Sequence, residues 1–308
     1  MCTAKLLTVK RAIATTIILL LGLTLLASRI MGKRAGSVLT MTKLLNQYNT
    51  HLDITYLTIN GHSLKLDVYQ RKTSQPHPTL IFIHGGGWIG GERRLQVRKL
   101  IPYLEMGLSV VNIEYRLAEI ALAPAAVKDC LCALRWVIRH AEKYNFDTDK
   151  IILAGESAGG HLALTTGLIP ASTQWDLPCP GEEELKVAAM INWYGITDVK
   201  DLVVGENIRE YAVIWLGNQP NKSEIAEQVS PLNYVQPNLP PILTIHGDAD
   251  TIVPYSHAVR LHQALDNAGV ENQLLTLPNA GHGQFSAAEE TQINQTIRAF
   301  LEQYQLLN

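Results

Sequence analysis

The sequence has little charge, few aromatic residues and few cysteines. Of its 308 residues, 18% are charged, 6% are aromatic and 4 are cysteine, whereas 47% are hydrophobic. That balance excludes an intrinsically disordered chain, which combines low hydrophobicity with high charge. Four cysteines are too few for a small disulfide scaffold, and the glycines and prolines follow no collagen-like repeat. A globular protein remains, long enough to bury a deep site from which water is excluded.

Positive charge is scarce outside the N-terminal region. Residues 1–34 contain six Lys/Arg and no acidic residue, which leaves 20 basic against 28 acidic residues in residues 35–308. No stripe of Lys and Arg interleaved with aromatic residues occurs there. Because nucleic-acid binding needs such a positive surface, we expect no nucleic-acid partner.

Residues 12–28 form an uncharged run rich in Leu and Ile, and basic residues flank it on both sides. As a helix these 17 residues would extend about 25 Å, at the short limit for spanning a bilayer. No clear cleavage site follows, so the pattern favours an uncleaved signal anchor over a signal peptide. We therefore expect residues 1–34 to contact a membrane. The rest of the chain is then membrane-anchored or secreted, and lies outside the cytoplasm.

The cysteines show no spacing typical of a metal site. Cys130 and Cys132 lie two residues apart in a helical pattern and so point to different faces. Cys2 belongs to the basic N-terminal region, and Cys179 lies in a proline-containing loop. We predict that they are unpaired, small buried hydrophobic residues.

Short apolar runs alternate with helical patterns through residues 35–308. A hairpin is predicted over residues 53–69, turning at Asn60-Gly61. Six further strands are predicted, over residues 79–84, 108–115, 150–155, 187–194, 241–246 and 272–277. Between them apolar residues recur at steps of three and four, as in helices. This alternation predicts an α/β fold: a mostly parallel sheet with helices on both faces and reactive residues at the carboxyl ends of its strands.

A G-x-S-x-G pattern with Ser157 at its centre follows one of these predicted strands and precedes an apolar helical run. A serine on such a sharp turn is lifted out of the sheet, and glycine neighbours leave room for it. The next helix then directs its free N–H groups at the reacting oxygen. The pattern therefore favours a nucleophile over a merely structural turn.

Three consecutive glycines, Gly85 to Gly87, follow another predicted strand, between His84 and Trp88. Such a loop can direct several backbone N–H groups at one point, as a tetrahedral oxyanion requires. A phosphate-binding loop is the alternative, but no G-K-[ST] sequence follows. We expect His84 to hold this loop rather than to act as a base.

A serine nucleophile needs a base, and an imidazole base needs an acceptor that fixes its tautomer. His282 follows the last predicted strand among small residues, which suits it to the role of the base. Asp248 and Asp250 both follow the preceding strand, and the residues themselves do not separate these two candidates for the acid.

Several motifs occur together in one order: HGGGW at residues 84–88, EYRLA at 114–118, GESAGGH at 155–161, HGDADTIVP at 246–254 and NAGHG at 279–283. Taken together, the sequence resembles α/β-hydrolase esterases of the hormone-sensitive-lipase-like and feruloyl-esterase-like groups, in register from about residue 53 to the C-terminus. The resemblance implies an α/β-hydrolase domain over residues 35–308.

The resemblance also implies roles for individual residues. The nucleophile carries over to Ser157, the base to His282, and the acid to Asp250 rather than Asp248. The oxyanion donors carry over to the backbone N–H groups of Gly86, Gly87 and Ala158. Residues 119–123 depart from the proline-rich segment usual at that place, and the stretch before the first strand is too short for the N-terminal cap of the lipase-like group.

Together these observations predict a serine hydrolase that cleaves a small-molecule carboxylic ester through an acyl-enzyme, without a metal or organic cofactor. An exopeptidase or amidase using the same three residues is the alternative, and a non-catalytic binding module is a third. Residues 198–234 break the strand-helix alternation and are expected to form a lid or an ordinary packed helix. Trp88 and Trp215 are candidates for lining the substrate pocket. Neither the acyl and alcohol specificity nor the oligomeric state follows from the sequence.

Overall fold

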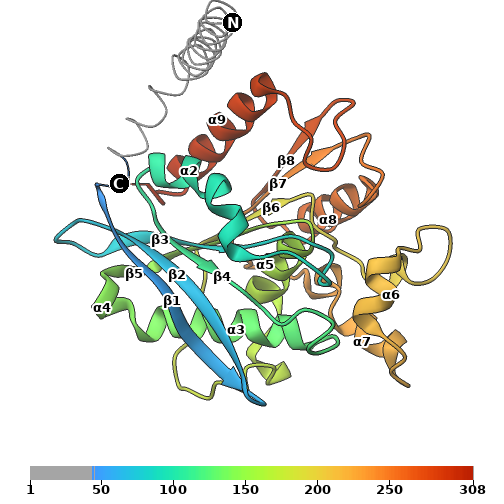
Figure 1. Ribbon diagram of the computed structural model, residues 1–308. Helices are drawn as coiled ribbons and strands as arrows, with labels where there is room; N and C mark the ends of the chain where they lie inside the picture. Colours follow the sequence, from blue (N-terminus) through green and yellow to red (C-terminus); the bar gives the residue numbers. More distant parts are fainter. Residues whose placement is uncertain (1–43, 45, 308) are drawn as a thin grey trace, which may run out of the picture. The chain divides into compact units, whose positions relative to one another are not determined.

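The computed structural model describes residue 44 and residues 46–307 (Figure 1). The chain divides into two compact units, Met1–Tyr48 and Asn49–Asn308. The predicted membrane segment, residues 1–34, lies outside the described residues. Within the part that is described, no helix has both the length and the apolar character needed to cross a membrane.

An eight-stranded sheet forms the centre of the second unit, in the order β1-β2-β4-β3-β5-β6-β7-β8. The strand β2 pairs antiparallel with β4, and each pair from β4 through β3 to β8 is parallel. The bounds are β1 Tyr48–Ile59, β2 His62–Arg71, β3 His77–Ile83, β4 Ser109–Ile113, β5 Phe146–Glu156, β6 Ala189–Trp193, β7 Ile242–Gly247 and β8 Asn272–Leu277. The mostly parallel sheet predicted from the sequence is confirmed.

The β1-β2 hairpin turns where the sequence predicts it. Asn60 and Gly61 have φ of 51° and 78°, so both lie in the left-handed region that a two-residue turn of this kind requires. The six further predicted strands correspond to β3 to β8, with differences only at their ends. The inner strands are buried on both faces, which explains their continuous apolar runs.

Helices cover both faces of the sheet (Figure 1). The step from β3 to β4 runs opposite to the step from β5 to β6, so right-handed connections place their helices on opposite faces. One face carries α2 (Val97–Glu105) and α9 (Ala287–Gln303), and the other carries α3 (Ala125–Arg139), α5 (Ala158–Leu168) and α8 (Ser256–Asn267). The shorter helices are α4 (Ala141–Tyr144), α6 (Glu210–Leu216) and α7 (Lys222–Gln228).

Local sequence explains where these helices begin and which faces they bury. Ser286 and Glu289 form a reciprocal capping box at the start of α9. Helix α9 buries Ile293, Ile297, Phe300 and Leu301, which recur at steps of three and four, and leaves Tyr304 half-buried at its C-terminal end. Helix α5 is apolar around almost its whole circumference, which suits its position between the sheet and α3.

A disulfide joins Cys132 of α3 to Cys179 of the loop between α5 and β6, with a Cα–Cα distance of 5.5 Å. The prediction that the cysteines are unpaired is therefore wrong for these two, while Cys130 is a free, buried thiol. The helical pattern around Cys132 carried no information about a loop that returns to it 47 residues later. Cys2 lies outside the described residues.

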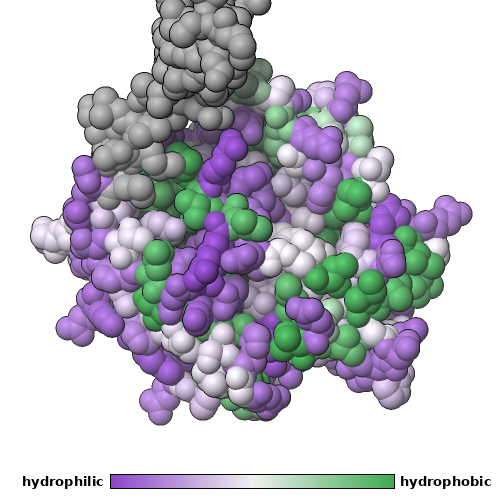
Figure 2. All heavy atoms as spheres, in the orientation of Figure 1, coloured by the Kyte–Doolittle hydropathy of each residue, from purple (hydrophilic) through white to green (hydrophobic). Residues whose placement is uncertain are grey.

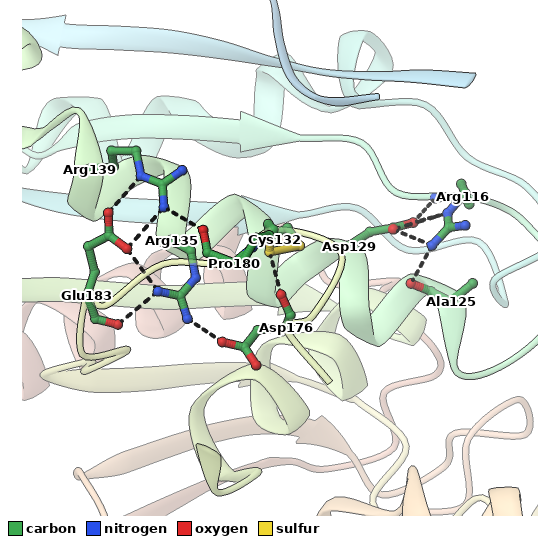
Figure 3. The surroundings of a disulfide bond; sticks show 10 residues. Arg116, Ala125, Asp129, Cys132, Arg135, Arg139, Asp176, Pro180 and Glu183 are labelled. Atoms are coloured by element: carbon green, nitrogen blue, oxygen red, sulfur yellow. Dashed lines mark hydrogen bonds and ion pairs between the residues drawn. A yellow bond between two sulfur atoms is a disulfide. The ribbon is translucent and has the colours of Figure 1, made fainter. Parts of the chain in front are cut away.

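Ion pairs reinforce this attachment of the loop to α3 (Figure 3). The buried guanidinium of Arg135 binds Asp176 and also Glu183, and Arg139 binds Glu183 from the next turn of the helix. Near the N-terminal end of the same helix, Asp129 is fully buried and accepts hydrogen bonds from the Arg116 side chain at 2.7 to 3.1 Å. The helix α3 therefore anchors two loops, one at each end of its length.

Candidate active site

Ser157 lies on a sharp turn between β5 and α5. Its φ of 54° and ψ of −118° place a non-glycine residue in a strained region of backbone conformation. A Cβ atom on Gly155 would lie 2.2 Å from the carbonyl oxygen of Gly159, and one on Gly159 would lie 2.1 Å from that of Ile83. Only glycine fits at both positions. The strand, turn and helix predicted around Ser157 are all present.

His282 and Asp250 come together from two neighbouring loops. Asp250 follows β7 and His282 follows β8, and the imidazole Nδ1 donates a hydrogen bond to Asp250 Oδ2 at 2.7 Å. The other oxygen of Asp250 accepts hydrogen bonds from the backbone N–H groups of Ile252 and Val253. Asp248 instead accepts a hydrogen bond from the backbone N–H of Asn279. The geometry therefore pairs His282 with Asp250, as the resemblance implied.

The carboxyl group of Asp250 has a low pKa. Burial raises the pKa, but hydrogen bonds from His246 and His282 and from the backbone outweigh burial and hold it well below its ordinary value. The group is therefore an ionised carboxylate at neutral pH. Such a carboxylate can fix the tautomer of His282 and stabilise its protonated form.

Ser157 and His282 line one cavity of about 490 Å³. The glycine loop from Gly85 to Gly87 lines the same cavity, so the predicted nucleophile, base and loop face a common space. The other lining residues are Ile89, Gly91, Gln96, Glu156, Tyr194, Tyr211 and Ile252. This volume suits a small organic molecule.

The glycine loop is built so that side chains would not fit. Gly86 and Gly87 have φ of 120° and 60°, and a Cβ atom on Gly86 would lie 2.1 Å from the carbonyl oxygen of Gly90. The loop follows β3, which pairs with β5 up to Ile83 and Gly155, so it starts beside the turn that carries Ser157. His84 is buried, stacks on Tyr115, and lies within hydrogen-bond distance of the Gly85 carbonyl. It does not line the cavity, in keeping with the loop-holding role expected for it.

Two further residues beside the site, Tyr194 and Lys99, have no counterpart in the sequence predictions, and both bind Glu156. Tyr194 donates a hydrogen bond to Glu156 Oε1 at 3.0 Å, and its ring lies edge-on to the His282 ring with centroids 4.5 Å apart. Lys99 Nζ lies 2.6 Å from the same Glu156 oxygen. Tyr194 follows β6, at the same edge of the sheet as Ser157, and that position was the signal that could have identified it.

The comparisons with known proteins place this architecture in a family. The BD-FAE family model matches residues 66–265. The chain belongs to the BD-FAE family. The resemblance to α/β-hydrolase esterases of the hormone-sensitive-lipase-like group is thereby confirmed.

Curated relatives of this BD-FAE chain include two bacterial esterases. It is 33% identical over 227 residues to Esterase LipC of Mycobacterium tuberculosis, which covers 71% of this chain and 56% of LipC. It is 27% identical over 248 residues to Ethyl acetate hydrolase of Pseudomonas putida, covering 75% and 74% of the two chains. The chain thus spans little more than half the length of LipC.

Solved structures share the fold over almost their full length. A truncated carbohydrate esterase from gut microbiota matches with a TM-score of 0.73 and 27% identity, covering 84% of this chain and 97% of that one. Native esterase 2 of Thermogutta terrifontis matches with a TM-score of 0.70 and 25% identity, covering 85% and 94%. The α/β-hydrolase fold expected from the sequence is confirmed.

The two tryptophans expected at the substrate pocket of this BD-FAE member lie elsewhere. Trp88 and Trp215 are fully buried, stack with ring centroids 4.1 Å apart, and are absent from the lining of the cavity. Trp88 has a φ of 61°, and its indole N–H donates to His161 Nδ1 at 3.2 Å. The stack therefore packs within the core, and Ile89, Tyr211 and Ile252 form the apolar wall in its place.

Residues 198–234 contain α6, α7 and short 3-10 turns. Helix α6 buries Trp215 on one side, brings Tyr211 into the cavity lining, and exposes Val213 and Ile214 on the other side. Figure 2 shows hydrophobic side chains gathered over this part of the surface. Tyr211 lies one helical turn before Trp215, so the apolar pattern that singled out Trp215 also marked the residue that lines the cavity.

Among the residues that the structure describes, no group of three or more His, Cys, Asp or Glu side chains is arranged to hold a metal ion.

Proposed function

We propose that the chain is a carboxylic ester hydrolase that works through an acyl-enzyme on Ser157. The observation that carries this proposal is the shared cavity of Ser157 and His282, together with the 2.7 Å hydrogen bond that fixes His282 on Asp250. The relatives named as esterases support the same class of reaction.

In the first step Ser157 Oγ attacks the ester carbonyl while His282 Nε2 takes the hydroxyl proton. The tetrahedral intermediate then breaks its bond to the alcohol, and His282 returns the proton to the leaving oxygen. A water molecule repeats the sequence on the acyl-enzyme and releases the acid. Asp250 remains ionised throughout and stabilises the imidazolium that forms twice in each cycle.

The negative charge of the intermediate needs donors that are already in place. We assign this role to the backbone N–H groups of Gly86, Gly87 and Ala158. Gly86 and Gly87 line the cavity, and Ala158 begins α5, where the backbone N–H groups have no partner within the helix. The backbone N–H of Ser157 itself donates to the carbonyl of Trp193 and is not available for this purpose.

The decisive experiment compares Ser157→Ala with the matched control Ser63→Ala, whose serine is exposed on the β1-β2 hairpin. Ser157→Ala should lower kcat on a nitrophenyl acetate by a factor of about 10⁴ or more and abolish labelling by a fluorophosphonate probe. Ser63→Ala should behave as wild type. An active or labelled Ser157→Ala protein would overturn the proposal. Parallel assays with the corresponding nitroanilide, in which an amide replaces the ester, distinguish an ester hydrolase from an amidase.

We also propose that residues 1–34 bring the chain to a membrane and that the catalytic unit works outside the cytoplasm. The Cys132–Cys179 disulfide supports this compartment, because disulfides form and persist in oxidising environments. Alkylation of the chain in intact and lysed cells tests it. Cys132 and Cys179 are expected to be joined as a disulfide before lysis and so not to react with the alkylating reagent. Free thiols at both positions would contradict it.

A further inference from the structure

A second cavity, of about 510 Å³, lies directly beside the catalytic one. Gln96 and Glu156 line both, so the two spaces adjoin at the residue that precedes Ser157. We call the second cavity the α2–α9 groove, after the two helices that form its sides on one face of the sheet (Figure 1). Among its other lining residues are Trp193 and Phe285, Lys99 of α2, and Asn294 of α9.

Two half-buried aromatic residues, Trp193 and Phe285, line the groove. Trp193 and Phe285 have centroids 6.4 Å apart with an interplanar angle of 35°. The indole is held in place because its N–H donates to the hydroxyl of the buried Tyr103 at 2.8 Å. A fixed aromatic face in a concave site suits a flat, mainly apolar ring, which it can stack against.

The two helices line the groove with both polar and apolar side chains: Arg98, Lys99, Ile101 and Pro102 come from α2, and Glu290 and Asn294 from α9. Leu95, which is 75% exposed, also lines the groove. The Lys99 ammonium lies 5.9 Å from the centroid of the Trp193 ring and binds Glu156 at the boundary between the two cavities. That charge pair is satisfied within the chain, and Arg98 and Glu290 also line the groove, so the part of the groove suited to an uncharged group is the pair of rings of Trp193 and Phe285.

The chemistry of acyl transfer decides which part of a substrate enters the groove. The leaving oxygen must lie next to His282, because this residue returns the proton to it. Gly283 follows His282 directly and Phe285 comes three residues after it, and both line the groove, so the groove opens on the side of the base. The carbonyl oxygen faces the glycine loop, and the acyl group is left with Ile89, Tyr211 and Ile252 in the catalytic cavity.

We propose that the α2–α9 groove binds the alcohol portion of the substrate, and that the substrates are esters of alcohols carrying a flat, mainly apolar ring. The inference rests on the proposed function, since only an ester hydrolase has a leaving alcohol. Trp193 and Phe285 are then the residues that determine alcohol specificity.

The test uses three esters: ethyl acetate, 2-naphthylmethyl acetate with the ring on the alcohol side, and ethyl 2-naphthylacetate with the ring on the acyl side. The measured quantity is kcat/KM of each naphthyl ester divided by that of ethyl acetate. In Phe285→Ala the ratio for the ring-bearing alcohol should fall about tenfold, because a stacking partner is lost. The ratio for the ring-bearing acyl group should stay within about twofold of wild type.

A second variant fills the groove without removing any aromatic residue. Asn294→Trp places a large side chain at the groove wall on α9 and should lower the same ratio. The matched control is Gln292→Trp, an exposed position on the same helix that does not line the groove, and it should leave all rates unchanged.

Each result bears on one of the two proposals. An unchanged alcohol ratio in both Phe285→Ala and Asn294→Trp overturns the groove assignment while the ester hydrolase stands. A fall confined to the ring-bearing acyl ester also overturns it, because the groove then holds the acyl portion. A general loss of rate with unchanged ratios indicates damage to His282 and counts against it as well. If wild type hydrolyses none of the three esters and no probe labels Ser157, the proposed function itself fails.

Discussion

His246 Nε2 lies 3.2 Å from Asp250 Oδ2, and both side chains are fully buried. The same carboxylate oxygen accepts the hydrogen bond from His282, so one oxygen holds two imidazoles. His246 is the next-to-last residue of β7 and also lies 3.1 Å from the carbonyl oxygen of Val253. This histidine thereby links the end of a buried strand to the carboxylate that binds His282.

The first prediction concerns that link. His246→Leu removes the donor and frees the carboxylate to turn, so kcat should fall about tenfold or more while KM changes little. His246→Gln keeps an N–H donor at a similar reach and should recover most of kcat. Steady-state kinetics on one ester measures both. Equal losses in the two variants would show that His246 serves packing alone.

The second prediction concerns acid stability. Burial lowers the pKa of His161 to about 3 and that of His257 to about 4, and it also lowers the pKa values of His84 and His262. In the unfolded chain a histidine has a pKa near 6.5, so between pH 6.5 and 4 the unfolded state binds protons that the folded state does not. Stability is therefore greatest above pH 6.5 and falls as the pH is lowered. His161 and His257 each remove about 1.4 kcal/mol per pH unit in that range.

Urea unfolding at pH 7.5 and pH 5.0 measures this dependence. His161→Gln removes one of the buried titrating groups, so its free energy of unfolding should depend less on pH than that of wild type. His51→Gln is the control, because His51 is exposed and should leave the slope unchanged. Equal slopes in all three proteins would contradict the prediction.

The third prediction concerns the disulfide. Closing a loop of 47 residues lowers the conformational entropy of the unfolded chain, which raises its free energy by about 4 kcal/mol in the loop-entropy model. Dithiothreitol should therefore lower the free energy of unfolding of wild type by up to that amount. The double variant Cys132→Ser/Cys179→Ser should match reduced wild type and show no response to the reductant. Cys130→Ala keeps the disulfide and should respond as wild type does.

The fourth prediction concerns the glycine loop. A Cβ atom on Gly87 would lie 2.9 Å from Tyr211 Cβ, so Gly87→Ala must displace either the loop or α6. A shift of the oxyanion donors should lower kcat about a hundredfold. Gly61→Ala is the matched control, because Gly61 also has a positive φ but nothing lies within 4 Å of the added atom. It should lose stability without losing activity.

Much of the site could be predicted because local geometry dictates it. The turn at Ser157 tolerates only glycine at Gly155, two residues before it, and at Gly159, two residues after it. The pattern is therefore visible within five residues. The alternation of strands and helices likewise placed the catalytic loops at one edge of the sheet. The choice between Asp248 and Asp250 did not follow from the residues themselves, because both lie in one loop and only the hydrogen bonds of the fold distinguish them.

Features that depend on long-range approach could not be predicted. The partner of Cys132 lies 47 residues away on a loop whose path no local pattern records. Trp88 follows the glycine loop directly, and from the sequence it is expected at the substrate pocket. In the structure it has a positive φ, and its ring is buried against Trp215 instead. The bond between Lys99 and Glu156 joins α2 to the end of β5, and it depends on how that helix packs on the sheet.

The strained backbone conformation of Ser157 lowers the stability of the folded chain. A residue with a Cβ atom at φ 54° and ψ −118° costs of the order of 1–3 kcal/mol, and glycine at that position would relieve most of this strain. Ser157→Gly should thus be an inert protein that is harder to unfold than Ser157→Ala, which keeps the Cβ atom. Under the proposed function, this cost in stability is what the fold carries in order to present one hydroxyl group at the cavity.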